Sequence, residues 1–282
     1  MFTVGEQWAH GRRTLAAAGL AHPGREAALL LGSLLGLSEL QTRTRDDQPV
    51  DAGIAARFAT LLARRAAGEP MAYLLGRREF FGRSFAVDER VLIPRPETEL
   101  LIEIALAADL PVEASVLDIG TGSGCIALTL AAERPRWRVQ ATDLSLDALA
   151  CARANARDLG LSDRVVFVAA DLAAPIALAG IDLVVANPPY IDPLEPALVA
   201  LDVRTYEPHL ALFAGDRGLA TVARLFGLAE GLHAGALLAC EIGFGQLDAV
   251  LDLASARPAL ELVEVRRDLA DIARDVVFRR TA

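Results

Sequence analysis

The feature that most constrains the fold is a series of apolar segments that alternates with helical patterns from residue 115 onward. The first five segments are nearly continuous apolar runs, as parallel strands buried on both faces require. Helical patterns such as Leu146–Leu159 and Leu219–Leu232 separate several of them. The order predicts an α/β fold with a mostly parallel seven-stranded sheet, closed at one edge by an antiparallel hairpin of the last two strands. The seven expected strands are Ser115–Ile119, Arg138–Thr142, Val165–Ala170, Ile181–Ala186, Ala236–Ile242, Leu260–Val265 and Val276–Arg279.

The region before the sheet has a different periodicity. Apolar residues recur at three- and four-residue spacing around Ala27–Leu35 and Ile54–Leu62, which predicts a small helical bundle, with residues 43–49 as a polar connection. At 79–88 the period changes to two around Gly82, which indicates a short hairpin. We therefore expect a helical domain at 1–75, a hairpin linker at 76–95 and the α/β domain at 96–282.

Composition excludes several classes of protein. Apolar residues make up 53% of the chain, yet every apolar run ends long before bilayer length, so we expect no membrane span. No basic stretch followed by an apolar block opens the sequence, so no signal peptide is expected. Three widely spaced cysteines fit neither a disulfide framework nor a zinc site, which favours the cytoplasm and no metal.

Charge is shared unevenly along the chain. All 28 basic residues are arginines, and the net charge is −9. Residues 1–94 hold 12 Arg against 10 Asp and Glu, whereas residues 95–282 hold 16 against 27. Such an acidic main domain repels phosphate backbones and attracts basic proteins, although a surface tuned for solubility would look the same.

A glycine-rich loop follows the first strand of the sheet. Gly120, Gly122 and Gly124 alternate between a buried strand and a helix, so the backbone can turn sharply and a ligand can approach it. A dinucleotide fingerprint would place its third glycine at position 125, which is Cys125 here. The spacing favours a smaller nucleoside-type ligand, although a tight turn alone would also use these glycines.

Two aspartates end the next two strands. Asp143 is placed to accept hydrogen bonds from ribose hydroxyls. Its alternative role is to cap the following helix, but Ser145 can do that. Asp171 lies where an adenine edge would rest, and Leu172 would supply apolar surface beside it.

The most specific motif is Asn187-Pro188-Pro189-Tyr190, which follows the fourth strand. Prolines lock the backbone and carry no N–H, so the Asn187 side-chain oxygen and the Pro188 carbonyl can both accept hydrogen bonds from one NH₂ group. Tyr190 would lie flat against the planar group that carries this nitrogen. A proline-rich turn would explain the prolines but not the Asn and Tyr that bracket them. The motif therefore predicts a site that aims a weakly nucleophilic amide or amine nitrogen at an electrophile.

The whole chain resembles the class I S-adenosylmethionine methyltransferases, and within them the PrmC/HemK group of protein-glutamine methyltransferases. Four segments carry this resemblance: Arg78–Gly82, Leu92–Glu99, Asn187–Tyr190 and Tyr206–Pro208. It implies a Rossmann-like fold, S-adenosylmethionine as cofactor, and methylation of the glutamine in the Gly-Gly-Gln motif of class I peptide chain release factors. It also implies a set of cofactor contacts, of which Leu172 is a departure because relatives can carry tryptophan there. They are Gly120, Thr121, Gly122, Ser123, Gly124, Asp143, Asp171, Leu172 and Asn187.

By the same resemblance Asn187, Pro188, Pro189 and Tyr190 hold the substrate glutamine, with Asn187, Pro188 and Tyr190 as catalytic groups. The segment 191–216 exceeds ordinary loop length, so we expect a flap that faces the substrate. The alternatives are an adenine-N6 nucleic-acid methyltransferase, which the acidic main domain disfavours, and an inactive binding module. We assign the helical domain to recognition of the protein substrate, because the α/β domain already holds all the chemistry.

Overall fold

The computed structural model describes residues 2–174, 176–195 and 199–281. The chain divides into two compact units. We call residues 1–77 with 200–206 the helical unit, and residues 78–199 with 207–282 the sheet unit. The chain therefore leaves the sheet unit within the long segment after Tyr190, contributes to the helical unit, and returns.

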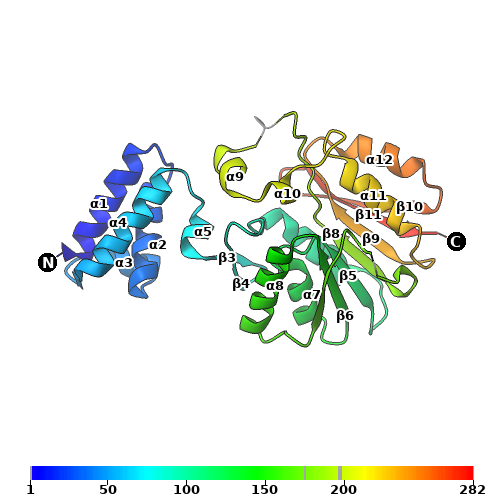
Figure 1. Cartoon of the computed structure of the whole chain (residues 1–282), viewed down its shortest axis with the longest axis horizontal. Helices are drawn as coiled ribbons and strands as arrows, with labels where there is room; N and C mark the ends of the chain where they lie inside the picture. Colours follow the sequence, from blue (N-terminus) through cyan, green and yellow to red (C-terminus); the bar gives the residue numbers. More distant parts are fainter. Residues whose placement is uncertain (1, 175, 196–198, 282) are drawn as a thin grey trace. The chain divides into compact units, whose positions relative to one another are not determined.

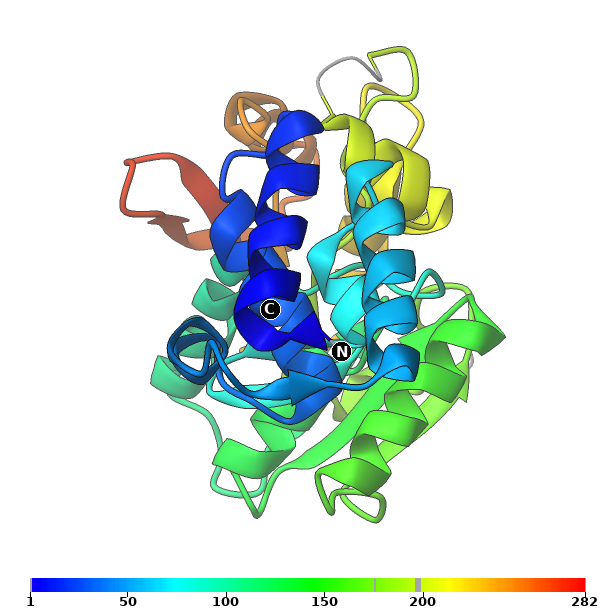
Figure 2. The same ribbon diagram turned by 90° about the vertical axis from the view of Figure 1, so that its left-hand side faces the viewer.

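The helical unit begins with a short β1 (Phe2–Thr3), which pairs with β2 (Pro49–Val50). Side chains of α1, α2, α4 and α5 form an apolar core that includes Leu15, Leu31 and Phe58. Helices α1, α2 and α4 lie side by side (Figures 1 and 2). Oxygen-bearing side chains at Thr3, Ser38 and Asp51 accept backbone N–H groups and fix where three helices start. The helices are α1 (Val4–Ala17), α2 (Pro23–Leu35), α3 (Glu39–Thr44), α4 (Ala52–Ala66), α5 (Met71–Leu75) and α9 (Leu201–Tyr206).

The prediction of a connection at residues 43–49 was wrong at both ends of this range. Residues 43–49 were expected to be a connection throughout, but Arg43 and Thr44 end α3 and Pro49 belongs to β2. Ser38 and Gln41 form a reciprocal capping box that starts α3. At its other end the Arg45 backbone N–H donates to the Gln41 oxygen, so the helix extends two residues into the polar stretch.

The sheet has seven strands in the order β10-β11-β9-β8-β5-β6-β7. The five strands from β9 to β7 are parallel, and β10 and β11 form an antiparallel hairpin that pairs with β9 (Figure 1). The predicted α/β fold with its closing hairpin is confirmed. The strands are β5 (Ser115–Ile119), β6 (Arg138–Asp143), β7 (Val165–Ala169), β8 (Leu183–Ala186), β9 (Leu237–Glu241), β10 (Leu260–Arg267) and β11 (Ala273–Arg280).

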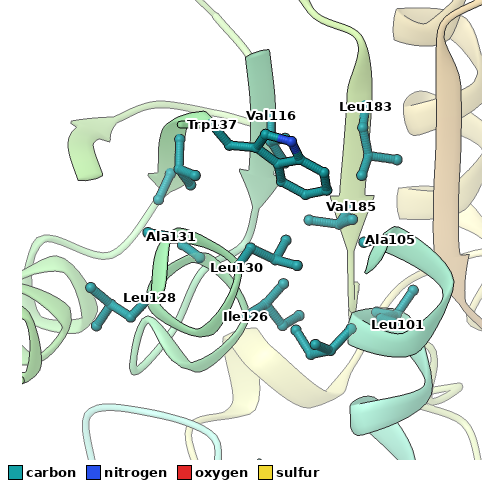
Figure 3. Packing of buried hydrophobic residues seen from close by; sticks show 14 of the residues in the cluster. Leu101, Ala105, Val116, Ile126, Leu128, Leu130, Ala131, Trp137, Leu183 and Val185 are labelled. Atoms are coloured by element: carbon teal, nitrogen blue, oxygen red, sulfur yellow. The ribbon is translucent and has the colours of Figure 1, made fainter. Parts of the chain in front are cut away.

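Alternate residues of the central strands serve two separate cores, because neighbouring side chains on a strand point to opposite faces. On one face Val116 and Val185 pack with helices α6 and α7, and Figure 3 shows Ile126 and Leu130 of α7 beside Val185. On the other face Leu117 packs with α11 and α12. The helices of this unit are α6 (Glu99–Ala107), α7 (Cys125–Glu133), α8 (Leu146–Asp158), α10 (His209–Leu212), α11 (Ala220–Ala229) and α12 (Leu247–Ser255), with 3₁₀ turns η1 (Pro96–Thr98) and η2 (Leu178–Gly180).

A hairpin of β3 (Arg77–Phe80) and β4 (Arg83–Ala86) precedes the sheet. Its turn is Phe81-Gly82, with φ of 49° and 71°, which is the pattern of a two-residue turn with both residues left-handed. The hairpin that the sequence predicted around Gly82 is therefore present, with Gly82 as the second residue of its turn. Phe80 and Phe85 meet edge to ring across the hairpin and join the core that contains α6 and α7.

Candidate functional site

A cavity of about 290 Å³ opens at the carboxyl edge of the sheet unit. The strands β5, β6 and β8 are neighbours in one parallel sheet, so the residues that follow them meet at this edge. The cavity is lined by Gly120 and Gly122 after β5, by Asp143, Leu144 and Ser145 after β6, by Asp171 and Leu172 after β7, by Asn187, Pro188 and Pro189 after β8, and by residues such as Val91, Leu210 and Phe213.

The glycine-rich loop forms one wall through only two of its five predicted residues. Gly120 (φ 76°) and Gly122 (φ 54°) line the cavity, and an added Cβ on either would meet no described atom within 4 Å. Their backbone is therefore open to a ligand. Their left-handed φ is also one that residues with side chains rarely adopt, which favours glycine at both positions. Thr121 and Ser123 are buried, and a Cβ on Gly124 would lie 2.9 Å from Leu128. These three shape the turn and do not line the cavity.

Asp143 lies at the end of β6 with both carboxylate oxygens facing backbone N–H groups. Its Oδ2 accepts from Gly122 at 2.9 Å, and its Oδ1 accepts from Ser145 at 2.8 Å. Burial raises the pKa of Asp143, and these N–H groups oppose the rise. Ser145 caps α8 through Ala148, so the cap does not require Asp143. The carboxylate also ties the glycine loop to the second strand, and each of its oxygens keeps a lone pair for a further donor.

The adenine-edge candidates lie side by side on the cavity wall. Asp171 is exposed and pairs with Arg224 at 2.8 Å. Leu172 has a left-handed φ of 54° and also packs against the core that contains α11. Both therefore line the cavity from the end of β7.

The Asn-Pro-Pro-Tyr motif leaves β8 toward the cavity. Asn187, Pro188 and Pro189 line it, whereas Tyr190 does not. The Asn187 Nδ2 group donates to the Thr98 hydroxyl at 2.9 Å. The Tyr190 hydroxyl lies 3.4 Å from a Glu241 carboxylate oxygen, and burial raises the pKa of Tyr190. The backbone oxygen of Tyr190 accepts from Gln246 at 2.9 Å.

Two family descriptions match separate parts of the chain. Residues 6–76 match the PrmC N-terminal domain, and residues 96–202 match the methyltransferase small domain. The release factor glutamine methyltransferase of Nitratidesulfovibrio vulgaris is 42% identical over 96% of this chain and 93% of its own. The enzyme of the same name from Moorella thermoacetica is 44% identical over 92% of each chain.

The chain belongs to the release factor glutamine methyltransferase family. It is a methyltransferase that uses S-adenosylmethionine. A solved structure of the hMettl16 catalytic domain in complex with MAT2A 3′UTR hairpin 6 aligns with a TM-score of 0.56 over 81% of this chain and 82% of that one. At 20% identity this likeness shows the shared fold alone. Among the described residues, no helix combines the length and apolar character that crossing a membrane requires.

Several side chains that form hydrogen bonds around the site were not predicted from the sequence. Thr98 was named only within Leu92–Glu99, one of the segments that carry the family resemblance, and Glu241 only within the predicted strand Ala236–Ile242. Glu207 is buried, accepts the Ile93 backbone N–H at 3.0 Å and pairs with Arg95 at 2.6 Å. A signal existed for Glu241, because a carboxylate inside an otherwise apolar buried strand needs a partner.

Gly218 is the backbone position that allows the motif to pack. Its φ is 84°, and an added Cβ would lie 2.1 Å from the Tyr190 oxygen. Gly235 has a similar φ of 92°, but a Cβ there would meet no described atom within 4 Å. We expect Gly235→Ala to lower the free energy of unfolding by about 1–2 kcal/mol through its φ alone. Gly218→Ala should cost about 1–3 kcal/mol more, because the clash is added.

Urea unfolding of both variants measures this difference. Gly218→Ala should also lower kcat, because Tyr190 must move, whereas Gly235→Ala should not. Equal losses of stability in the two variants would show that the contact with Tyr190 relaxes without cost.

Proposed function

We propose that this enzyme methylates the side-chain amide nitrogen of the glutamine in the Gly-Gly-Gln motif of class I peptide chain release factors. The names of its relatives support this substrate. The observation that carries the proposal is the orientation of Asn187: its NH₂ end is bonded to Thr98, so its oxygen is left for another donor beside the cavity. We place the reaction in the cytoplasm, where such a substrate is found.

The residues around the cavity fit S-adenosylmethionine. Gly120 and Gly122 leave the backbone open, Asp143 offers carboxylate oxygens to ribose hydroxyls, and Leu172 offers apolar surface. The apolar lining with a few convergent polar groups is typical of a nucleoside site. When bound, the cofactor supplies an electrophilic methyl group. Thr121, Ser123 and Gly124 would support the loop from behind, and Asp171 would lie at the adenine edge.

The motif supplies hydrogen-bond acceptors rather than an acid or base. An amide nitrogen is a poor nucleophile, because its lone pair is delocalised into the carbonyl. In our proposal the Asn187 side-chain oxygen and the Pro188 backbone oxygen accept the two N–H groups, which returns electron density to nitrogen and fixes its direction. Preorganised polar groups of this kind supply much of an enzyme's rate. Pro189 stiffens this backbone. Tyr190 lies outside the lining of the cavity, and in our proposal it bounds the plane of the amide from beyond that lining.

We further propose that the helical unit recognises the release factor. The cavity is lined entirely by residues of the sheet unit, so the helical unit adds nothing to the cofactor site. Segment 191–216, which we proposed as a flap facing the substrate, supplies α9 to the helical unit and α10 to the sheet unit. Residues 196–198 of this segment lie outside the described residues.

Mass spectrometry of a release factor after incubation with enzyme and S-adenosylmethionine tests the substrate. We expect a mass gain of one methyl group on the glutamine of the Gly-Gly-Gln motif. A release factor with glutamate at that position is the matched control and should gain none. Methylated adenine in nucleic acid, bound with a steep salt dependence, would instead support the nucleic-acid alternative.

A further inference from the structure

Three side chains from three elements form one hydrogen-bond chain beside the cavity. Glu241 Oε2 accepts the Thr98 hydroxyl at 2.7 Å, and Thr98 Oγ1 accepts Asn187 Nδ2 at 2.9 Å. Glu241 ends β9 and Asn187 follows β8, and the pairing of Ala186 with Cys240 brings them to the same level of the sheet. Thr98 is 2% exposed and Glu241 3%, so the Thr98–Glu241 end of these hydrogen bonds is shielded from water, whereas Asn187 is half-buried.

The direction of these hydrogen bonds follows from counting hydrogens. An ionised carboxylate only accepts, so the single hydrogen of the Thr98 hydroxyl must go to Glu241. The Thr98 oxygen can then only accept from Asn187. That requirement turns the NH₂ end of Asn187 toward Thr98 and its oxygen away. The opposite amide orientation would place two oxygens together with no hydrogen between them.

We propose that Glu241, acting through Thr98, is a positioning residue that holds the Asn187 side chain with its oxygen presented to the substrate amide. This inference rests on the proposed function, in which that oxygen accepts a substrate N–H. A protonated Glu241 could donate to Thr98, which would free the hydroxyl to donate to Asn187 and favour the reversed amide. The reversed Asn187 amide would turn its own NH₂ group toward the substrate NH₂ group. The substrate N–H would then lose the oxygen that accepts its hydrogen bond.

The charge state of Glu241 is set by several groups around it. Burial raises the pKa of Glu241 to about 7, with the Thr98 hydrogen bond opposing, nearby Glu97 raising it, and Arg274 and the Tyr190 hydroxyl lowering it. Asp275 lies opposite Glu241 in the β9–β11 register, and burial together with Glu241 raises the pKa of Asp275 to about 8. Because the ionised form of Glu241 is the productive one, kcat should be high above this pKa and fall as pH decreases through it.

Another buried carboxylate could mimic this behaviour. Asp118 lies beneath the glycine loop, where it accepts the Thr121 hydroxyl at 2.6 Å, and burial raises its pKa to about 7. Its protonation would act on the loop that faces the cofactor. Saturating S-adenosylmethionine and a Glu241→Gln variant separate the two effects, since a glutamine can present a carbonyl oxygen to Thr98 at every pH.

The test is the pH profile of kcat from about pH 5.5 to about pH 9 at saturating cofactor and release factor. Wild type should lose kcat on the acid side, and Glu241→Gln should lose this acid limb. Thr98→Val should lower kcat roughly tenfold at high pH with an unchanged KM for the cofactor, and Thr98→Ser should recover most of that loss. Thr129→Val is the matched control, because this buried hydroxyl has no hydrogen-bond partner among the described residues.

A second readout needs no substrate. The side-chain amide NMR signals of Asn187, assigned by their loss in Asn187→Ala, should shift with pH in wild type, stay constant in Glu241→Gln and move in Thr98→Val. An acid limb that persists in Glu241→Gln, or Asn187 signals that ignore both variants, would overturn the proposal. If wild type failed to methylate the release factor, the proposed function would fail, while the NMR signals would still report whether Glu241 orients Asn187.

Discussion

Asn187→Ala should lower kcat by roughly 100- to 1000-fold, as loss of one preorganised polar group does in other active sites. The variant removes the oxygen that we propose accepts a substrate N–H, and it also leaves the Thr98 oxygen without its donor. The effect should fall on kcat more than on KM, because the hydrogen bond strengthens as the nitrogen begins to bond to the methyl group.

Two controls separate this role from a structural one. Isothermal titration should show that the variant binds S-adenosylmethionine with similar affinity, because Asn187 is one of many residues that line the cavity. Thermal unfolding should remain cooperative. Near-normal turnover in a folded variant would refute the assigned role of Asn187.

Deleting residues 1–75 should reduce kcat/KM for a release factor by roughly a hundredfold or more, as loss of the main anchors of an interface does. The cavity belongs to the sheet unit, so S-adenosylmethionine should still bind. The measurement is the initial rate of methyl transfer to the intact release factor, compared between the truncated and full-length enzymes.

The control for the deletion is a short peptide that contains the Gly-Gly-Gln motif. This peptide offers the reacting glutamine without the rest of the release factor, so both enzymes should methylate it with similar kcat/KM. A truncated enzyme that methylates the intact factor normally would remove the helical unit from substrate recognition. Equal losses on peptide and protein would point to damage of the sheet unit.

The sheet could be predicted because its strands carry strong local signals. Ser115–Ile119 matches β5 residue for residue, and the other strands differ by at most a few residues at their ends. The positions of Asn187, Asp143 and Asp171 at one edge followed from the parallel order. These predictions needed only the period of the apolar residues and the rule that parallel strands end together.

The remaining parts of the site depend on contacts between distant residues. Thr98 and Glu241 are separated by 143 positions, and only the folded chain joins them. The hairpin turn at Phe81-Gly82 requires a left-handed φ at both residues. This conformation is uncommon for phenylalanine, so the sequence did not single out Phe81. The transfer of α9 to the helical unit is likewise a tertiary fact, recorded by the bond from the Tyr206 hydroxyl to the Ala67 oxygen at 3.2 Å.

The excursion of residues 200–206 into the helical unit has a mechanical consequence. The polypeptide passes between the two units after residues 77, 199 and 206, so the units share three covalent tethers. The second tether starts nine residues beyond Tyr190, and the third arrives at Glu207, which anchors Ile93 and Arg95. If, as we propose, the helical unit binds the release factor, α9 links the bound protein by covalent backbone to the segment that follows Asn187–Tyr190 on one side and to Glu207 on the other.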